Sequence, residues 1–275
     1  MLNNIAKPIL KWAGGKTQML GDLLPKVPKS YGRYIEPFFG GGAMFFALQP
    51  ENAIIADSNP ELINMYRQVA ENVDEVISYL KKYENTSEMF YAVREQDWMC
   101  LYKAEAAART IFLNRTCFNG LYRVNKKGQF NVPMGAYKNP TICDENNLRN
   151  ISNALQNVEI VCGDYTLSES FIDNNTFVYI DPPYRPISET SAFTSYNSDS
   201  FDDNEQIRLS QYIERIDKVG AKVVLSNSDP KNVNPDDMFF DDLYKSFKIH
   251  RVEATRAINS KAEKRGKISE LLICN

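Results

Sequence analysis

Short apolar runs alternate with longer amphipathic segments along this chain. Polar residues bound each run, as is typical of buried strands in a parallel sheet. The runs that we interpret as strands are residues 34–35, 53–56, 158–161, 177–180 and 222–226. One intervening segment repeats apolar residues at helical spacing, at Leu209, Tyr212, Ile213 and Ile216. This alternation predicts an α/β protein.

Local signals indicate where several elements begin and end. Asn59 followed by Pro60 is typical of a helix start, an N-cap with proline in the first turn. Gly220 is a typical helix C-cap. Two final apolar runs, at residues 247–254 and 268–274, have no helical segment between them. We therefore predict a Rossmann-like, mostly parallel sheet with an antiparallel hairpin at its C-terminal edge.

The strand pattern is interrupted by a segment with helical character. Residues 88–118 are rich in strong helix formers, and residues 125–129 have the polar composition of a hairpin turn. We predict a helical insertion at residues 60–141, which leaves residues 1–59 and 142–275 as one domain.

Composition argues against several classes of protein. The 275 residues contain no apolar run of membrane-spanning length, and Lys7, Lys11 and Lys16 interrupt any signal-peptide pattern. The five scattered cysteines form no CxxC pair, so we expect reduced thiols in a cytoplasmic protein without a zinc site. His250 is the sole histidine, which disfavours a Ser/His/Asp triad. We expect no metal and no need for an oligomer.

The net charge of −3 hides two basic segments. Either would suit local contact with a polyanion such as nucleic acid, and either is equally compatible with a solvated charged face. The first contains Arg109, Arg115, Arg123, Lys126 and Lys127, and the second contains Lys245, Lys248, Arg251, Arg256, Lys261, Lys264, Arg265 and Lys267.

A glycine-rich turn at residues 37–42 follows the first strand, and its glycines permit close approach of a ligand to the backbone. Phe38, Gly40 and Gly41 are its candidate contacts. Asp57 closes the next strand, where an acid can bind ribose hydroxyls. The turn itself carries no Lys or Arg, so an adenosine ligand without a polyphosphate fits best, and S-adenosylmethionine is such a ligand. Asp164 could contact the adenine ring, or could be an ordinary strand-end acid.

The segment Lys11-Trp12-Ala13-Gly14-Gly15-Lys16 superficially resembles a phosphate-binding loop. It lacks the GxxxxGK[ST] spacing, so we reject ATP hydrolysis.

The tetrapeptide Asp181-Pro182-Pro183-Tyr184 directly follows the run at residues 177–180. The prolines end the strand and leave the acid at the carboxyl edge of the sheet, where α/β proteins bind ligands. Asp181 and the Pro182 carbonyl could accept hydrogen bonds from an exocyclic amine, and Tyr184 could stack on its ring. The simpler alternative is an Asp-Pro turn that caps a strand. We interpret Asp181, Pro182 and Tyr184 as catalytic.

Together these segments resemble the DNA adenine-N6 methyltransferases of the Dam type, especially the DpnM-like members. The resemblance extends over nearly the whole chain, and the order of the motifs is similar to the family's alpha arrangement. Its motifs are residues 11–16, 36–42, Asp57, 119–123, 130–133, 181–184, 193–196 and 225–227.

The resemblance implies roles for individual residues. Trp12, Lys16, Asp57 and Asp181 would line the S-adenosylmethionine site, and the insertion would recognise the DNA target. Lys11 would reach a base near the target, Leu121 would fill the gap left by a flipped adenine, and Arg123 would read a guanine. The residues that would face DNA are Lys11, Arg94, Asn119, Leu121, Arg123, Pro133, Tyr137 and Lys138. From its own pattern, Leu121 would otherwise be interpreted as core.

One motif departs from the family. Members usually have Gly-Arg-Tyr after the Asn-Val-Pro stretch, whereas this chain has Gly135-Ala136-Tyr137, so one cationic DNA contact is missing. The family's usual target, the adenine of GATC in duplex DNA, is the leading expectation.

The expected reaction is methyl transfer to a flipped adenine, with Tyr184 and either Phe193 or Tyr196 holding the ring. Two alternatives remain open: an enzyme that methylates adenine in RNA, and a non-enzymatic DNA-binding protein that responds to adenosine. A nuclease is disfavoured because the chain lacks clustered metal-binding acids.

Overall fold

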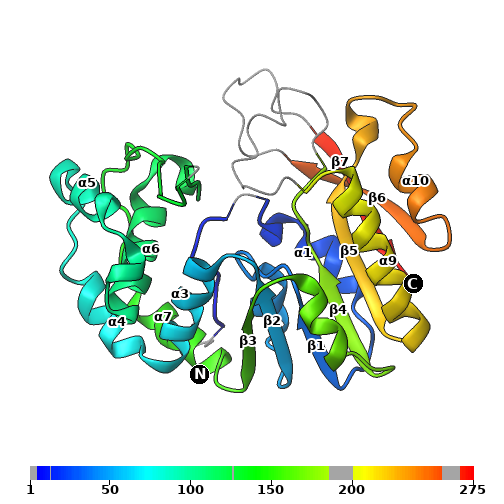
Figure 1. Cartoon of the computed structure of the whole chain (residues 1–275), viewed down its shortest axis with the longest axis horizontal. Helices are drawn as coiled ribbons and strands as arrows, with labels where there is room; N and C mark the ends of the chain where they lie inside the picture. The colour runs from blue at the N-terminus through cyan, green and yellow to red at the C-terminus, as the bar shows by residue number, and fades with distance from the viewer. Residues whose placement is uncertain (1–4, 13, 126, 186–200, 256–266) are drawn as a thin grey trace. The chain divides into compact units, whose positions relative to one another are not determined.

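The structure, a computed structural model, describes residues 5–12, 14–125, 127–185, 201–255 and 267–275 (Figure 1). Its sheet has the strand order β3-β2-β1-β4-β5-β7-β6. The strands are β1 (Arg33–Glu36), β2 (Ala53–Asp57), β3 (Val158–Cys162), β4 (Thr176–Ile180), β5 (Lys222–Ser228), β6 (Lys248–Thr255) and β7 (Lys267–Cys274).

All seven predicted strands are confirmed, as is the Rossmann-like fold class. Strand β4 pairs in parallel with β1 and β5, and β2 pairs in parallel with β3. Strand β7 is antiparallel to both β5 and β6, which is the predicted C-terminal hairpin. All five residues of β4 are buried, which is consistent with the apolar run of its last four residues.

The chain forms two compact units, each with its own core. The first comprises residues 1–16 and 39–164, and the second comprises residues 17–38 and 165–275. The predicted insertion at residues 60–141 falls inside the first unit, and its boundaries stay a prediction.

Helices dominate the first unit. They are α2 (Ala43–Leu48), α3 (Pro60–Glu71), α4 (Val73–Leu80), α5 (Ser87–Glu95), α6 (Lys103–Thr116) and α7 (Glu145–Ala154), with short 3-10 turns η3 (Trp98–Cys100) and η4 (Phe118–Gly120). Helix α6 packs against α3, α4 and α5, and most of its residues are buried (Figure 1). The predicted start of α3 is confirmed, because the Asn59 side chain accepts hydrogen bonds from the N–H groups of Glu61 and Leu62.

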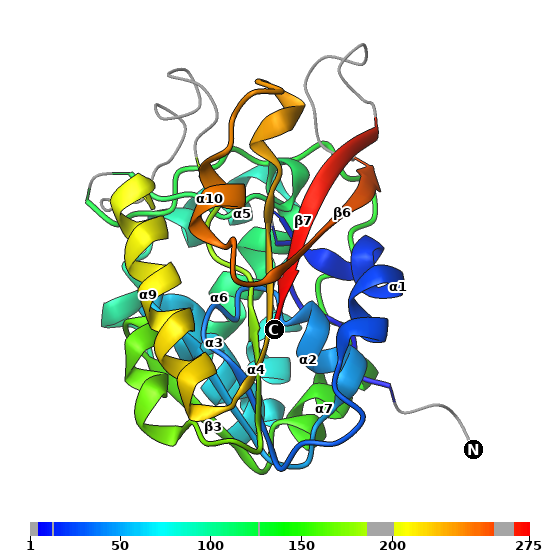
Figure 2. The same ribbon diagram turned by 90° about the vertical axis from the view of Figure 1, so that its right-hand side faces the viewer.

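The second unit is built on β1, β4, β5 and the hairpin. Its helices are α1 (Leu20–Leu23), α9 (Asp203–Val219) and α10 (Phe239–Leu243), and its 3-10 turns are η2 (Leu24–Lys26), η5 (Tyr165–Phe171) and η6 (Pro230–Asn232). Turn η1 (Lys16–Met19) starts at the last residue of the first unit's N-terminal segment. Figure 2 shows the long helix α9 and the β6–β7 hairpin. The predicted C-cap Gly220 is confirmed, with a left-handed φ of 96°.

Among the described residues, no helix is both long enough and apolar enough to cross a membrane.

Candidate functional site

The acid of the tetrapeptide lies directly beyond the end of β4. Asp181 is half-buried, and its Oδ1 accepts a hydrogen bond of 2.9 Å from the Ser226 hydroxyl. Ser226 is fully buried on the neighbouring strand β5, where its oxygen also lies 3.1 Å from the Tyr179 hydroxyl. A neutral hydroxyl therefore orients the carboxylate that the sequence predicts to be catalytic.

Buried side-chain amides hold the backbone of the tetrapeptide in place. Gln206 of α9 is fully buried and donates to the Pro183 carbonyl at 3.2 Å. Asn227 of β5 in turn donates to the Gln206 side-chain oxygen at 3.1 Å. Pro182 is buried and has no N–H that could form a backbone hydrogen bond. The side-chain amides of Gln206 and Asn227 are therefore suited to hold the turn rigid where the strand ends.

Tyr184 is held by an acid. Its hydroxyl donates to Glu270 Oε2 at 2.6 Å, and the ring is half-buried. Burial, followed by the nearby charges of Asp181 and Glu270, raises the pKa of Tyr184 above its ordinary value, so the hydroxyl stays protonated and continues to donate. The hydrogen bond fixes the orientation of a ring that the sequence predicts to stack on the substrate.

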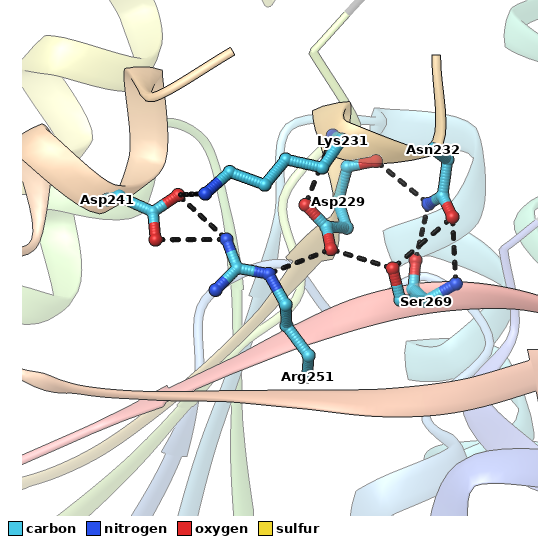
Figure 3. A network of polar contacts seen from close by, with 6 residues as sticks. All are labelled: Asp229, Lys231, Asn232, Asp241, Arg251 and Ser269. Atoms are coloured by element: carbon cyan, nitrogen blue, oxygen red, sulfur yellow. Dashed lines mark hydrogen bonds and ion pairs between the residues drawn. The ribbon is translucent and has the colours of Figure 1, made fainter. Parts of the chain in front are cut away.

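A polar network joins the end of β5 to Ser269, the residue before Glu270 (Figure 3). Asp229, which is 1% exposed, accepts from Arg251 Nε at 3.0 Å and from the Ser269 hydroxyl at 2.7 Å. The Asn232 amide donates to the Ser269 carbonyl at 2.6 Å and its oxygen accepts from the Ser269 N–H at 2.9 Å. These bonds fix strand β7 one residue before Glu270.

In the first unit, Asp57 organises the glycine turn. Its two carboxylate oxygens accept from the N–H groups of Gly40 and Asn59, each at 2.9 Å. Burial raises the pKa of Asp57 above its ordinary value, although the two backbone bonds act in the opposite direction. Gly40 has a left-handed φ of 47°, a conformation that favours glycine.

The structure brings most predicted cofactor residues of the first unit together. A Cβ atom at Gly40 would lie 2.7 Å from Trp12 Nε1, and one at Gly41 would lie 3.0 Å from Trp12 Cβ, so the Trp12 side chain covers both glycines and its indole lies against Gly40. The exposed Asp164 follows Gly163, whose N–H donates to the Asp57 carbonyl at 3.0 Å.

Lys16 and Phe38 are also predicted to bind the cofactor, and each contacts another residue of its own unit. Lys16 is 3% exposed and its ammonium donates to the Gly14 carbonyl at 2.7 Å. Phe38 belongs to the second unit, where its ring stacks on that of Tyr165 with centroids 5.1 Å apart.

The residues predicted to face DNA lie mainly in one irregular segment, residues 117–138, which backbone bonds fold on itself. Phe118 N–H donates to the Pro133 carbonyl at 2.9 Å, and Gly135 N–H donates to the Thr116 carbonyl at 2.8 Å. Asn119 is exposed with a left-handed φ of 55°, Pro133 and Lys138 are exposed, and Leu121 is half-buried. Leu121 is therefore not a fully buried core residue.

Three of the cations predicted to face DNA pack against neighbouring groups. Lys11 Nζ lies over the Tyr137 ring, 4.1 Å from its centroid. Arg123 Nε donates to the Asn131 side chain at 2.7 Å, which orients its guanidinium. Arg94 lies over the Tyr91 ring at 4.6 Å.

The first basic segment was predicted partly wrongly. Arg109 is 2% exposed, because it pairs with the equally buried Glu61 at 2.7 Å and donates to the carbonyls of Val93 and Arg94. The helical spacing of α6 gave no sign that this arginine faces inward. In the second basic segment, Arg251 is bound in ion pairs to Asp229 and Asp241. The remaining candidates at residues 256–266, like Lys126, lie outside the described residues.

Sequence reasoning missed Tyr122. Its ring stacks on Trp12 with centroids 5.4 Å apart and an interplanar angle of 27°, and its hydroxyl donates to Glu61 Oε2 at 2.6 Å. Burial, followed by the charge of Glu61, raises the pKa of Tyr122, so it remains a donor. Only its place between Leu121 and Arg123 could have drawn attention to it.

Phe193 and Tyr196, predicted to hold the base, lie outside the described residues. Within the part of the chain that is described, no group of three or more His, Cys, Asp or Glu residues could hold a metal ion.

Comparison with known proteins identifies relatives over the whole length of the chain. Residues 12–258 match the D12 class N6 adenine-specific DNA methyltransferases. The chain is 46% identical to Type II methyltransferase M.MjaIII of Methanocaldococcus jannaschii, covering 98% of this chain and 99% of that protein. It is 43% identical to Type II methyltransferase M1.LlaDCHI of Lactococcus lactis subsp. cremoris, covering 98% and 95% respectively. It is 34% identical to the DNA adenine methylase of Escherichia coli K12, covering 97% and 94%.

Proposed function

Because this chain belongs to the D12 class of N6 adenine-specific DNA methyltransferases, we propose that it transfers a methyl group from S-adenosylmethionine to N6 of an adenine in duplex DNA, within the sequence GATC. The observation that carries the proposal is the carboxylate of Asp181, oriented by Ser226 at the end of β4 and followed by a turn anchored by Gln206.

We propose that the adenine leaves the base stack and presents its amine to Asp181 and to the Pro182 carbonyl. The amine is a poor nucleophile because its lone pair is delocalised into the ring. Two acceptors for its hydrogens localise this pair on nitrogen and stabilise the positive charge that grows there. Unstacking costs a few kcal/mol, and the ring of Tyr184 offsets part of that cost by stacking.

When bound, S-adenosylmethionine supplies an electrophilic methyl group on a sulfonium. The adenine nitrogen would take the methyl group as the carbon–sulfur bond breaks with its electron pair on sulfur, and the proton that the nitrogen loses would pass to solvent water. In this proposal the methyl donor is bound by Trp12, Lys16, Phe38, Gly40, Gly41, Asp57, Asp164 and Asp181. Asp57 would hold the ribose hydroxyls and the glycines would let the backbone approach closely.

The DNA-facing set in this proposal is Lys11, Arg94, Asn119, Leu121, Arg123, Pro133, Tyr137 and Lys138. The half-buried Leu121 is suited to fill the space that an extruded base leaves. Arg123 is oriented by Asn131, and a guanidinium so placed could read a guanine. Ala136 is exposed at the position where the family motif predicts an arginine, so in this proposal position 136 supplies no cationic contact to DNA.

The test is methyl transfer by the purified protein from labelled S-adenosylmethionine to unmethylated DNA, with the modified adenines mapped by sequencing. We expect N6-methyladenine in GATC. Label in structured RNA and not in duplex DNA would instead make the protein an RNA methyltransferase, and DNA binding without transfer would make it a non-enzymatic binder.

Asp181→Ala is expected to lower kcat by at least about 100-fold, because a preorganised partner of the developing charge is lost. Duplex binding, measured by fluorescence anisotropy, should remain near that of the wild type. Near-normal transfer by this variant would rule out the role given to Asp181.

Arg123→Ala is expected to reduce discrimination between GATC and a duplex with its guanine replaced, by about 1–3 kcal/mol. Competition between the two duplexes measures this difference. Equal weakening on both would make Arg123 a phosphate contact.

A further inference from the structure

A continuous series of contacts in the first unit joins the glycine turn to the loop of residues 118–123. Trp12 lies at its centre. The Trp12 side chain covers both glycines: a Cβ atom at Gly40 would lie 2.7 Å from the indole Nε1, and one at Gly41 would lie 3.0 Å from Trp12 Cβ. The same indole stacks on the ring of Tyr122. One side chain therefore contacts both the turn and the loop.

Tyr122 is anchored at its far end. Its hydroxyl donates to Glu61 at 2.6 Å, and Glu61 is fixed by Arg109 at 2.7 Å and by the Thr110 hydroxyl at 2.9 Å. All three anchoring residues are 3% exposed or less. The tyrosine ring is thus held between a fixed acid and the indole, so its position depends on where Trp12 lies.

The start of α3 links the same acid to the ligand turn. The Asn59 side chain accepts from the Glu61 N–H at 3.0 Å, and the Asn59 N–H donates to Asp57 Oδ1 at 2.9 Å. Asp57 also accepts from the Gly40 N–H. Asp57, Asn59 and Glu61 therefore form a hydrogen-bonded path from the glycine turn to the acid that anchors Tyr122.

A second set of hydrogen bonds joins the segment at Lys11 to the loop of residues 118–123 and does not involve Tyr122. Asn114 is fully buried, and its side chain accepts from the Lys11 N–H at 2.8 Å and donates to the carbonyls of Lys11 and Gly120, each at 2.9 Å. The loop should therefore keep its place when the Tyr122 ring is removed. Tyr122 can therefore be replaced in an experiment without displacing the loop.

We infer that Tyr122 is a positioning residue that couples ligand occupancy of the glycine turn to the placement of Leu121 and Arg123, its neighbours in the loop. The inference rests on the proposed function, in which the turn binds S-adenosylmethionine and the loop contacts DNA. A ligand against Gly40 must contact or displace the indole, and the stacked tyrosine then moves with it. A tyrosine that only filled space would affect stability and leave the two binding events independent.

The experiment measures the affinity for S-adenosylhomocysteine with and without a short duplex that carries the mapped target site. The ratio of the two dissociation constants is the coupling factor, and by linkage it equals the effect of S-adenosylhomocysteine on duplex affinity. The chain has two tryptophans, so Trp98→Phe leaves Trp12 as the sole fluorescent tryptophan. Its emission reports directly on the stack and supplies a readout other than activity.

We expect a coupling factor of about 10 in the Trp98→Phe background, within the usual range of about 5–150, and a value below about 2 when Tyr122→Ala is added. Tyr122→Phe keeps the stack but loses the bond to Glu61, and should give an intermediate factor with a smaller change in Trp12 emission. Tyr102→Ala is the matched control, because Tyr102 is 80% exposed, and it should leave the factor unchanged.

The inference is overturned if Tyr122→Ala or Tyr122→Phe couples as strongly as the parent, or if the parent binds both ligands with no coupling at all. The phenylalanine variant decides the matter if circular dichroism shows that the alanine variant is unfolded. Either of these results would leave the proposed function standing. Failure of the parent to bind S-adenosylhomocysteine would instead overturn the proposed function, and this inference with it.

Discussion

Two acids of this protein, one in each unit, are held in place by different chemistry. Glu61 beneath the loop of residues 118–123 is buried against a cation, Arg109, at 2.7 Å. Asp181 at the end of β4 is oriented by a neutral hydroxyl, Ser226, at 2.9 Å. A buried ion pair fixes its partners firmly, but each charge then requires the other. A hydroxyl orients a carboxylate without bringing a positive charge of its own beside it.

The difference matches the tasks that we propose. Glu61 has to stay where it is and anchor Tyr122, so pairing with a guanidinium carries no functional cost. Asp181 has to stabilise positive charge that develops on adenine, and a neighbouring cation would oppose that charge. The amides of Gln206 and Asn227, which fix the turn after Asp181, are likewise neutral.

The largest effect should come from breaking the ion pair. Arg109→Met leaves Glu61 buried without its partner and should lower the free energy of unfolding by about 3–5 kcal/mol. Urea denaturation followed by circular dichroism measures the loss. The matched control is Arg149→Met, because Arg149 forms its ion pairs at an exposed position and should show little change. A loss no greater than that of the control would mean that the buried pair does not anchor the loop.

Removing the hydroxyl beneath Asp181 should act on the reaction more than on the fold. A hydrogen bond to a charged group contributes about 1.5–3 kcal/mol, so Ser226→Ala should lower kcat by about 10- to 100-fold. Steady-state transfer of labelled methyl groups provides the measurement. Ser210→Ala, which removes a buried hydroxyl that donates to the Ile207 carbonyl, is the control and should leave kcat unchanged. Similar losses for the two variants would contradict the assigned role of Ser226.

The third prediction concerns Asp57, which is held by backbone N–H groups and not by a side chain. Burial raises its pKa above the ordinary 3.8, so on acidification it takes up a proton at a higher pH than an exposed aspartate does. The protonated form accepts fewer ribose hydrogen bonds. The affinity for S-adenosylhomocysteine should therefore fall as the pH drops through this raised pKa, by at most about tenfold per pH unit.

Calorimetric titrations over a series of acidic pH values test the dependence on Asp57. Asp57→Asn should bind more weakly than the wild type at neutral pH and should lose the pH dependence. An unchanged acid dependence in Asp57→Asn would assign the titration to another group.

Much of the fold could be predicted from the sequence because its signals are local. A buried strand needs a run of apolar residues, a helix start needs a cap such as Asn59, and a left-handed C-cap favours Gly220. Each of these is decided by a few neighbouring residues. The strands and caps were therefore correctly placed before their partners were known.

The internal contacts of the candidate site could not be predicted in the same way. Arg109 and Glu61 are 48 positions apart, and the stack of Trp12 on Tyr122 spans an even greater separation. Such pairs depend on tertiary packing, for Arg109 and Glu61 the packing of α6 against α3, which periodicity does not encode. An arginine on an alanine-rich helix was thus interpreted as part of a basic surface, although the fold buries it.

The contact between Trp12 and the two glycines limits how this protein can vary over evolution. A methyl group at Gly40 would overlap the indole, so such a change requires a smaller residue at position 12 in addition to the strain of a left-handed φ of 47°. That second change would in turn remove the stacking partner of Tyr122. Positions 12, 40 and 122 should therefore vary together, and replacing one of them alone should disturb the contacts of the other two.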